Sequence, residues 1–382
     1  MKIVIVGAGK VGVALTRHLA VENRVTVIDQ NPHLVENIIN IYDVMGVCGN
    51  GASYDVQKEA DVEQADLLIA TTSSDEINIL TCLVAKKMGV QHTIARIRSP
   101  EYGRQLRFMR SELGLSMAIN PEAATAREIA RVLRFPTAMK LESFSKGRLE
   151  LVEYRVAEHT ALDGTRLSEL YRNFKVRVLI CAVARQGETI IPSGDFTLRA
   201  GDKIYLTAAP RELEKFFRLL GVFRARASSV MIVGASKMCY YLASELLEMG
   251  MSVKIIDQNE QRCVEMSEKL PRALVIVGDG TDSELLSEEG ISQTDAFVAI
   301  TGLDEANILM ALSAAKQSGD CCKVVAKINR KSLLELVSTE SLIDSVVSTG
   351  AVTTELILQY IRAMKNASAS KVKTLHRIVD EK

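Results

Sequence analysis

The chain has 382 residues, of which 47% are hydrophobic and 25% are charged, as in soluble globular proteins with several cores. Its formal net charge of +0 gives no electrostatic case for binding nucleic acid, and no apolar run approaches the ~18 residues that direct membrane insertion needs. The seven cysteines show neither a C-x-x-C spacing nor a histidine in metal-ligand register. We therefore expect reduced thiols, no metal site and a cytoplasmic location.

The stretch at residues 2–12 is an apolar β-branched run that leads directly into the pattern G-x-G-x-x-G, and residues 13–19 continue with a helical period. A second strand at residues 24–29 ends in an acid, Asp29, about 20 residues further on, which completes the dinucleotide-binding pattern. The first glycine allows a tight turn, the second a close phosphate, and the third close packing of helix on strand. The predicted phosphate loop is Gly7, Ala8, Gly9, Lys10, Val11 and Gly12.

The acid at the end of the second strand favours an adenosine ligand. A carboxylate at Asp29 is placed to accept both ribose hydroxyls, and Gln30 follows without an arginine that would hold a 2′-phosphate, so NADP is disfavoured. The same acid would serve ATP, ADP or AMP, so it indicates adenosine rather than redox chemistry.

Three later strands add candidate ligands at their carboxyl ends, where parallel sheets form a ligand crevice. Asn50 and Gly51 follow the third strand, as base or ribose contacts or as an ordinary loop. Thr72 and Ser73 follow the fourth, where hydroxyls would reach a phosphate or cap the next helix. Arg96 ends the fifth, as a phosphate contact or a solvated strand-end residue.

A helix opens at Asn120-Pro121-Glu122 and carries a broad apolar face, which suits packing against another subunit or within its own domain. From residue 137 the pattern changes to alternating strands, turn signals and one helix at residues 167–174, which predicts a small α+β module. A short segment at residues 221–229 then has the composition of a linker.

The chain then begins again, with Val230 to Gly234 repeating the first strand and its turn. The offset between equivalent residues drifts only from 227, as between Gly7 and Gly234, to 231, as between Arg96 and Lys327. This indicates the duplication of a whole domain. The predicted second set of ligands is Gly234, Ala235, Ser236, Lys237, Met238, Asp257, Asp279, Thr301 and Lys327. Because Ser236 and Cys239 replace two glycines, we expect weaker binding there or a different adenine nucleotide.

The predicted fold class is α/β, with two Rossmann-like doubly wound parallel-sheet domains separated by a small α+β module. The expected limits are 1–136 for the first domain, 137–220 for the module, 221–229 for the linker and 230–365 for the second domain. Residues 366–382 resemble the first strand of the small module, which suggests the start of a second module that is cut short.

This order resembles the RCK/KTN family, specifically its tandem TrkA type. The resemblance rests on residues 7–12, Asp29, residues 49–51, 71–78 and 95–98, with their counterparts in the second half. It implies a regulator, in which NAD(H) and ATP or ADP share or compete for the sites of a homo-oligomer, a dimer or tetramer. That oligomer would lie on the inner face of the cell membrane, docked on a TrkH/TrkG-like potassium transporter subunit.

The residues themselves favour a regulator over the alternative, an NAD-dependent oxidoreductase. Such an enzyme needs a general acid or base beside the nicotinamide, and none of the five histidines has a convincing partner in the sequence. No helix-turn-helix pattern or basic recognition helix indicates a transcriptional sensor. We therefore expect no catalytic residues, and a nucleotide that acts through differential affinity for two conformations.

Overall fold

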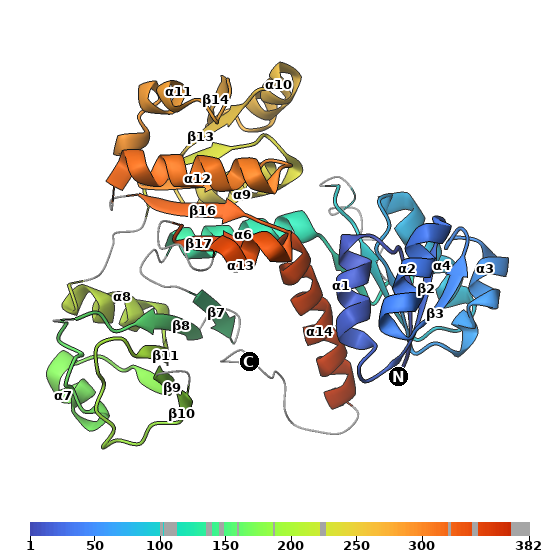
Figure 1. Ribbon diagram of the computed structural model, residues 1–382, viewed down its shortest axis with the longest axis horizontal. Coiled ribbons are helices and arrows are strands. Elements are labelled where there is room, and N and C mark those ends of the chain that lie inside the picture. The colour runs from blue at the N-terminus through green and yellow to red at the C-terminus, as the bar shows by residue number, and fades with distance from the viewer. Residues whose placement is uncertain are drawn as a thin grey trace.

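A computed structural model describes residues 1–99, 102, 113–134, 140–144, 149–158, 160–185, 188–221, 227–319, 322–337 and 343–367. These residues form two parallel sheets of six strands each, joined in sequence by a small antiparallel sheet (Figure 1). The architecture confirms the predicted fold class. The predicted helix after Pro100, most of the linker and the tail from residue 368 lie outside the described residues.

The first domain has the strand order β3-β2-β1-β4-β5-β6, with every neighbouring pair parallel. Its central strands are continuous apolar runs that are buried on both faces, as parallel sheets between helices require. The strands are β1 (Lys2–Val6), β2 (Arg24–Asp29), β3 (Met45–Cys48), β4 (Leu67–Ala70), β5 (His92–Arg96) and β6 (Met117–Ile119). The helices are α1 (Lys10–Leu19), α2 (Pro32–Tyr42), α3 (Tyr54–Glu59), η1 (Val62–Gln64), α4 (Asp75–Lys87) and α6 (Pro121–Arg134).

The second domain repeats this order as β14-β13-β12-β15-β16-β17, which matches the internal repeat in the sequence. Its strands are β12 (Ser229–Val233), β13 (Ser252–Asp257), β14 (Leu274–Val277), β15 (Ala296–Ala299), β16 (Lys323–Lys327) and β17 (Ser345–Val347). Its helices are α9 (Lys237–Glu248), α10 (Glu260–Lys269), α11 (Ser283–Glu288), η3 (Ile291–Gln293), α12 (Asp304–Ser318), α13 (Lys331–Val337) and α14 (Thr349–Ala367).

The small module is an antiparallel sheet in the order β10-β9-β11-β8-β7 with a core of its own. Aliphatic side chains make up most of that core, and four aromatic residues, Tyr154, Phe174, Phe216 and Phe217, pack among them. Its strands are β7 (Lys140–Phe144), β8 (Leu149–Arg155), β9 (Leu179–Arg185), β10 (Glu188–Ile190) and β11 (Lys203–Ala208). Its helices are η2 (Leu167–Glu169), α7 (Leu170–Phe174) and α8 (Pro210–Leu219).

The two large domains exchange their last helices. Helix α6 leaves the first sheet, and its apolar face, including Ile129 and Leu133, joins the core around β12 and α9 of the second domain. Helix α14 makes the reverse crossing and packs Ile357 and Ile361 into the core behind β1 and α1 (Figure 1). The expectation that α6 packs in its own domain or on another subunit was therefore wrong. Periodicity shows that a helix has an apolar face but does not name the surface that covers it.

The six cysteines that the structure describes are free. Within the described residues, no helix combines the length and the apolarity that crossing a membrane requires.

Candidate nucleotide-binding sites

The first glycine loop joins the end of β1 to helix α1. Gly7 has a φ of +104°, and a Cβ built on it would lie 2.9 Å from the Thr71 carbonyl carbon, so this turn requires glycine. A Cβ on Gly12 would lie 1.8 Å from the Gly7 carbonyl oxygen, so the helix passes the turn too closely for any side chain. Gly9 differs, because its Cβ would meet no atom of the described part of the chain within 4 Å. That open space is where the sequence predicts a phosphate.

Helix α1 begins in the geometry of an anion-binding site. Gly9 occupies the cap position, and no side chain among the described residues caps this helix. Its first-turn N–H groups therefore remain available to an acceptor and point, with the positive end of the helix dipole, toward the loop.

Asp29 fixes this loop from the end of β2. One carboxylate oxygen accepts a hydrogen bond from the Ala8 N–H at 2.6 Å, and the other accepts one from the Asn31 N–H at 2.8 Å. Each oxygen retains a further lone pair, so the predicted ribose contacts remain available. The acid thus has a structural role that the sequence pattern did not reveal, because it orients the phosphate loop before any ligand binds.

Residues after β3 line the same edge of the sheet. Gly51 is required by packing, since its Cβ would lie 2.1 Å from a methyl carbon of Val6. The Asn50 side chain accepts a hydrogen bond from the Ala52 N–H at 3.0 Å and so shapes the turn itself. Gln30 is exposed and receives a weak contact on its carbonyl oxygen from the Cys48 thiol at 3.7 Å.

A buried asparagine holds the loop after β4. Asn78 is fully buried, and its Oδ1 accepts hydrogen bonds from both the N–H and the hydroxyl of Thr72, each at 2.8 Å. Its amide group donates to the Thr72 and Arg96 carbonyls at 3.2 and 2.9 Å. The Thr72 hydroxyl has two acceptors within reach, Asn78 Oδ1 at 2.8 Å and the Ser74 carbonyl oxygen at 3.2 Å, so a phosphate contact through its proton requires that proton to leave both. The sequence signal for Asn78 was its recurrence, since Asn307 occupies the same place in the repeat.

The cation at the end of β5 is partly buried and paired. One Arg96 nitrogen lies 3.4 Å from Glu122 Oε1, and another donates to the Thr72 carbonyl at 3.3 Å. Burial lowers the pKa of Arg96, and the nearby Glu122 carboxylate opposes that shift. Arg96 Nε and Glu122 Oε2 are both buried, and neither has a hydrogen-bond partner among the described residues. Sequence reasoning used Glu122 only as part of a helix start and missed that it reaches the arginine predicted to bind phosphate.

The second glycine loop keeps the turn but closes part of the anion site. Gly234 has a φ of +112°, and Asp257 accepts the Ala235 N–H at 2.7 Å and the Asn259 N–H at 2.8 Å, as in the first copy. However, Ser236 caps helix α9 by accepting from the Cys239 N–H at 3.4 Å, and its own N–H donates to the Gly234 carbonyl at 3.0 Å. Two backbone donors of this loop are therefore already used, and the expectation of weaker binding at the second site stays a prediction.

The other predicted residues of the second site follow the first copy with changed chemistry. Asp279 replaces Asn50, and hydrogen bonds from the N–H and hydroxyl of Thr281, followed by one from Gln258, lower its pKa. The Thr301 hydroxyl donates to Asn307 Oδ1 at 2.7 Å, and Lys327 donates its ammonium proton to the Thr301 carbonyl. Burial lowers the pKa of Lys327, and the negative charges of Asp304 and Glu122 oppose this shift.

Charged groups of the two halves lie near each other at the carboxyl edges of the two sheets. The pKa of Glu76, in the first turn of α4, is lowered to about 2 by the Ser74 hydroxyl, its own backbone and Tyr102, with a smaller contribution from Lys237. Lys237 and Met238 begin helix α9 of the second domain. In the same way, the positive charge of Lys10 in the first loop contributes to lowering the pKa of Lys327 in the second domain. The carboxyl edges of the two sheets therefore lie close enough for their charges to interact.

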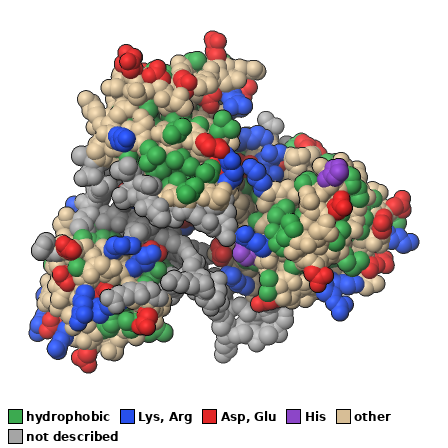
Figure 2. All heavy atoms as spheres, viewed as in Figure 1, with side chains coloured by type: hydrophobic (Ala, Val, Ile, Leu, Met, Phe, Trp, Pro, Cys, Tyr) green, Lys and Arg blue, Asp and Glu red, His purple; other side chains and the backbone are tan. Residues whose placement is uncertain are grey.

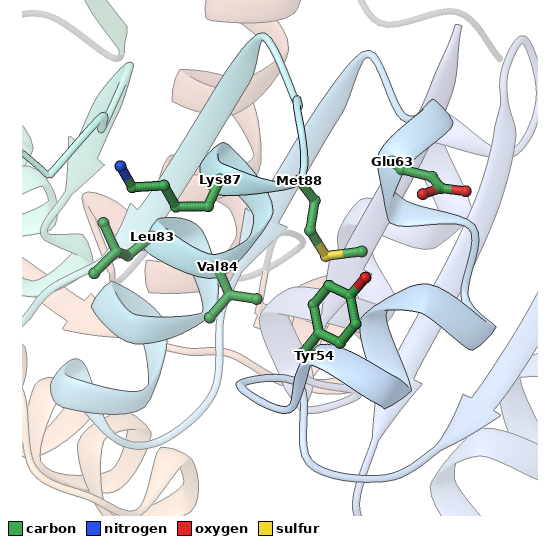
Figure 3. A pocket seen from close by; sticks show the side chains of 6 residues that line it. All are labelled: Tyr54, Glu63, Leu83, Val84, Lys87 and Met88. Carbon is green, nitrogen blue, oxygen red and sulfur yellow. The ribbon is translucent and has the colours of Figure 1, made fainter.

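A groove on the first domain lies apart from the glycine loop. Figure 3 shows it between α3, η1 and α4, with Tyr54 and Met88 facing each other across it. The side chains that line it are Tyr54, Glu63, Leu83, Val84, Lys87 and Met88. None of them is a predicted nucleotide ligand, so this groove is not the predicted site.

Comparison with known proteins identifies the family. The TrkA-N domain matches residues 3–121 and again residues 230–349, and the TrkA-C domain matches residues 151–221. The chain belongs to the TrkA family. It is 32% identical over 373 residues to a Trk system potassium uptake protein TrkA homolog of Archaeoglobus fulgidus, covering 97% of this chain and 84% of that protein. A TrkA of Vibrio alginolyticus is 33% identical over 378 residues, or 98% of this chain and 82% of that protein.

Solved structures with the same fold are RCK domains. The GsuK RCK domain superposes on this TrkA-family chain with a TM-score of 0.71 at 20% identity, covering 96% of this chain and 77% of that one. The GsuK channel bound to NAD also gives 0.71, at 22% identity, over 96% of this chain and 64% of that one. GsuK bound to ADP gives a TM-score of 0.59 at 16% identity, covering 95% of this chain and 69% of that one. At these identities the likeness establishes the fold alone.

Proposed function

We propose that this TrkA-family chain is the nucleotide-sensing regulatory subunit of a potassium uptake system, and that NAD(H), with ATP or ADP as the alternative ligand, binds first at the loop of residues 7–12. The observation that carries the proposal is the uncapped start of α1, whose N–H groups face open space at Gly9 beside the preoriented Asp29. Structures of GsuK with NAD and with ADP support the choice of ligands.

A nucleotide regulates by binding one conformation of a protein better than another. The exchanged helices α6 and α14 give this chain a mechanical basis for such a response, because each helix is attached to one sheet and packs on the other. A change at the carboxyl edge of one sheet is thereby passed to the core of the other.

The family supports a proposed partner and location for this chain. Relatives named Trk system potassium uptake proteins support a membrane-embedded TrkH/TrkG-like transporter subunit as the partner. The chain would then be cytoplasmic and peripheral on the inner face of the membrane, held there through its partner rather than by insertion.

Self-association, as a dimer or tetramer, is the third part of the proposal. Figure 2 shows hydrophobic side chains gathered on the face of the second domain around α12, where Leu303 is 68% and Leu309 65% exposed. Leu80, the counterpart of Leu309 in the first domain, is 45% exposed. Leu309→Glu should lower the mass measured by light scattering, whereas Val264→Glu, at a 51% exposed site on α10, should not. A strictly monomeric parent chain at tens of micromolar would refute self-association.

Isothermal titration calorimetry of NADH, NAD, ATP and ADP against the full chain tests the nucleotide assignment. We expect one tighter site per chain for NADH or ADP, weakened by Asp29→Ala, and a second, weaker event. A thermally stable chain that gives no saturable heat with any of the four nucleotides would overturn the proposal. Consumption of NADH with a reducible substrate would instead indicate the oxidoreductase.

A further inference from the structure

One hydroxyl group crosses between the two halves beside the candidate sites. Tyr241, in the second turn of α9, accepts a hydrogen bond from the Asn120 side-chain amide at 2.9 Å and donates one to the Arg98 carbonyl at 3.2 Å. Both partners belong to the first half of the chain. The hydroxyl therefore ties the helix that begins at the second glycine loop to the segment that follows β5.

Arg98 continues this connection to the first candidate site. Its backbone N–H donates to Asp75 Oδ2 at 2.9 Å, and its Nε lies 3.7 Å from Asp75 Oδ1. Its guanidinium also donates to the carbonyl of Ser73, a residue of the loop that the sequence assigns to the phosphates. Direct contacts thus run from Ser73 through Arg98 and Tyr241 to α9, whose first turn borders the second site.

Among the described residues, the repeat has no equivalent of this connection in the opposite direction. With the offset of 227 positions that applies at the glycine loops, the counterpart of Tyr241 is Ala14, which has no polar group. The counterpart of Arg98 is Asn329, since the N–H groups of both donate to the aspartate that begins the following helix, Asp75 or Asp304. The link is therefore an addition to the duplicated fold rather than a consequence of it.

We propose that the Tyr241 hydroxyl couples the two nucleotide sites, so that a nucleotide in one site changes the affinity of the other. The inference rests on the proposed function. A phosphate that engages the Ser73 loop displaces Arg98, and the hydroxyl passes that displacement to the start of α9. Because coupling of binding is reciprocal, occupation of the second site acts on the first by the same factor.

The absence of tryptophan from the chain allows each site to be observed separately. Met45→Trp on β3 and Leu274→Trp on β14 place a fluorophore at equivalent, exposed positions, 62% and 56% exposed in the parent. Quenching by NADH then reports each site on its own. Gly9→Ala, whose Cβ would lie more than 4 Å from every described neighbouring atom, serves to block the first site.

The experiment measures the NADH affinity of the second site with and without Gly9→Ala, in the parent and with Tyr241→Phe. In the parent we expect the block to change the Kd by about 5-fold or more, as is typical of allosteric coupling. Tyr241→Phe keeps the ring and should reduce that change to less than about 2-fold. Tyr240→Phe is the matched control, because no described residue hydrogen bonds to that hydroxyl, and it should preserve the coupling.

Three outcomes would overturn the proposal: equal coupling in the parent and with Tyr241→Phe, no coupling in the parent, or quenching only at the Met45→Trp reporter. Quenching at neither reporter, in chains with unchanged thermal unfolding, would instead refute the proposed nucleotide site itself. The two proposals therefore fail in distinguishable ways.

Discussion

Gly9→Ala separates the ligand-binding role of the first loop from its folding role. Gly9 has φ −73° and ψ −173°, an extended conformation open to any residue, and an alanine Cβ there would meet no atom of the residues that the structure describes within 4 Å. We therefore expect the free energy of unfolding to change by no more than about 0.5 kcal/mol. The methyl group would, however, occupy the space in front of the first-turn N–H groups of α1, where the phosphate is expected.

The expected magnitude follows from overpacking a closely fitted contact, which costs about 1–3 kcal/mol and corresponds to about a 5- to 150-fold increase in Kd. Gly12→Ala provides the contrast. Its Cβ would lie 1.8 Å from the Gly7 carbonyl oxygen and 2.9 Å from the carbonyl carbon, so the backbone must move and the fold itself should lose about 1–3 kcal/mol.

Calorimetric titration with NADH and thermal unfolding of the same samples distinguish the two effects. Gly9→Ala should weaken binding at an unchanged melting temperature, whereas Gly12→Ala should lower the melting temperature even without ligand. An unchanged Kd in the folded Gly9→Ala chain would refute the location of the phosphate. Ser236→Gly makes the reverse change in the second loop and should strengthen binding there.

Three further substitutions probe the structure around the sites. Asn78→Ala removes the hydrogen-bond partner of the loop after β4 and leaves the Thr72 N–H unsatisfied. Chemical denaturation should therefore show that the free energy of unfolding falls by about 2–4 kcal/mol, and a fall of less than about 1 kcal/mol would contradict this role. Ile129→Ala leaves a cavity at a fully buried position where α6 packs on the second domain. The free energy of unfolding should fall by about 2–5 kcal/mol in the same measurement, and an unchanged value would contradict this packing. Burial raises the pKa of Asp295, but hydrogen bonds from Ser228 and Ser229 outweigh burial and lower it, so its stabilising effect is present above about pH 4 and is lost as pH falls. Asp295→Asn should therefore flatten the acid limb of a stability–pH curve, and an unchanged limb would argue against that role.

The sequence predicted the fold in outline because strand and helix periods are local, and because the duplication tests each assignment twice. The six-strand order appears in both halves, and the two aspartates that close the first βαβ units, Asp29 and Asp257, hold their loops in the same way. A pattern that recurs at a fixed offset is far more specific than either copy alone.

The remaining features depend on contacts between residues distant in the chain. The pairing of Arg96 with Glu122, and the hydrogen bonds of Asn78 to the Arg96 carbonyl, become visible only when β5, α4 and α6 are brought together. The apolar face of α6 was evident in the sequence, but its partner, the second domain, was not. Tyr241 gave no signal because a tyrosine on a largely apolar helix is ordinary until its hydroxyl is found beside Arg98 and Asn120.

The exchange of α6 and α14 means that the covalent connection between the halves is not what holds them together. Each half lacks the helix that completes its own core and carries the helix that completes its neighbour's. A chain cut near residues 221–229 should therefore behave as a split protein, whose two fragments reassemble when produced together and expose apolar surface when produced alone. The two repeated domains are thus held together by a reciprocal exchange of one helix each, while their phosphate loops differ at Gly9 and Ser236.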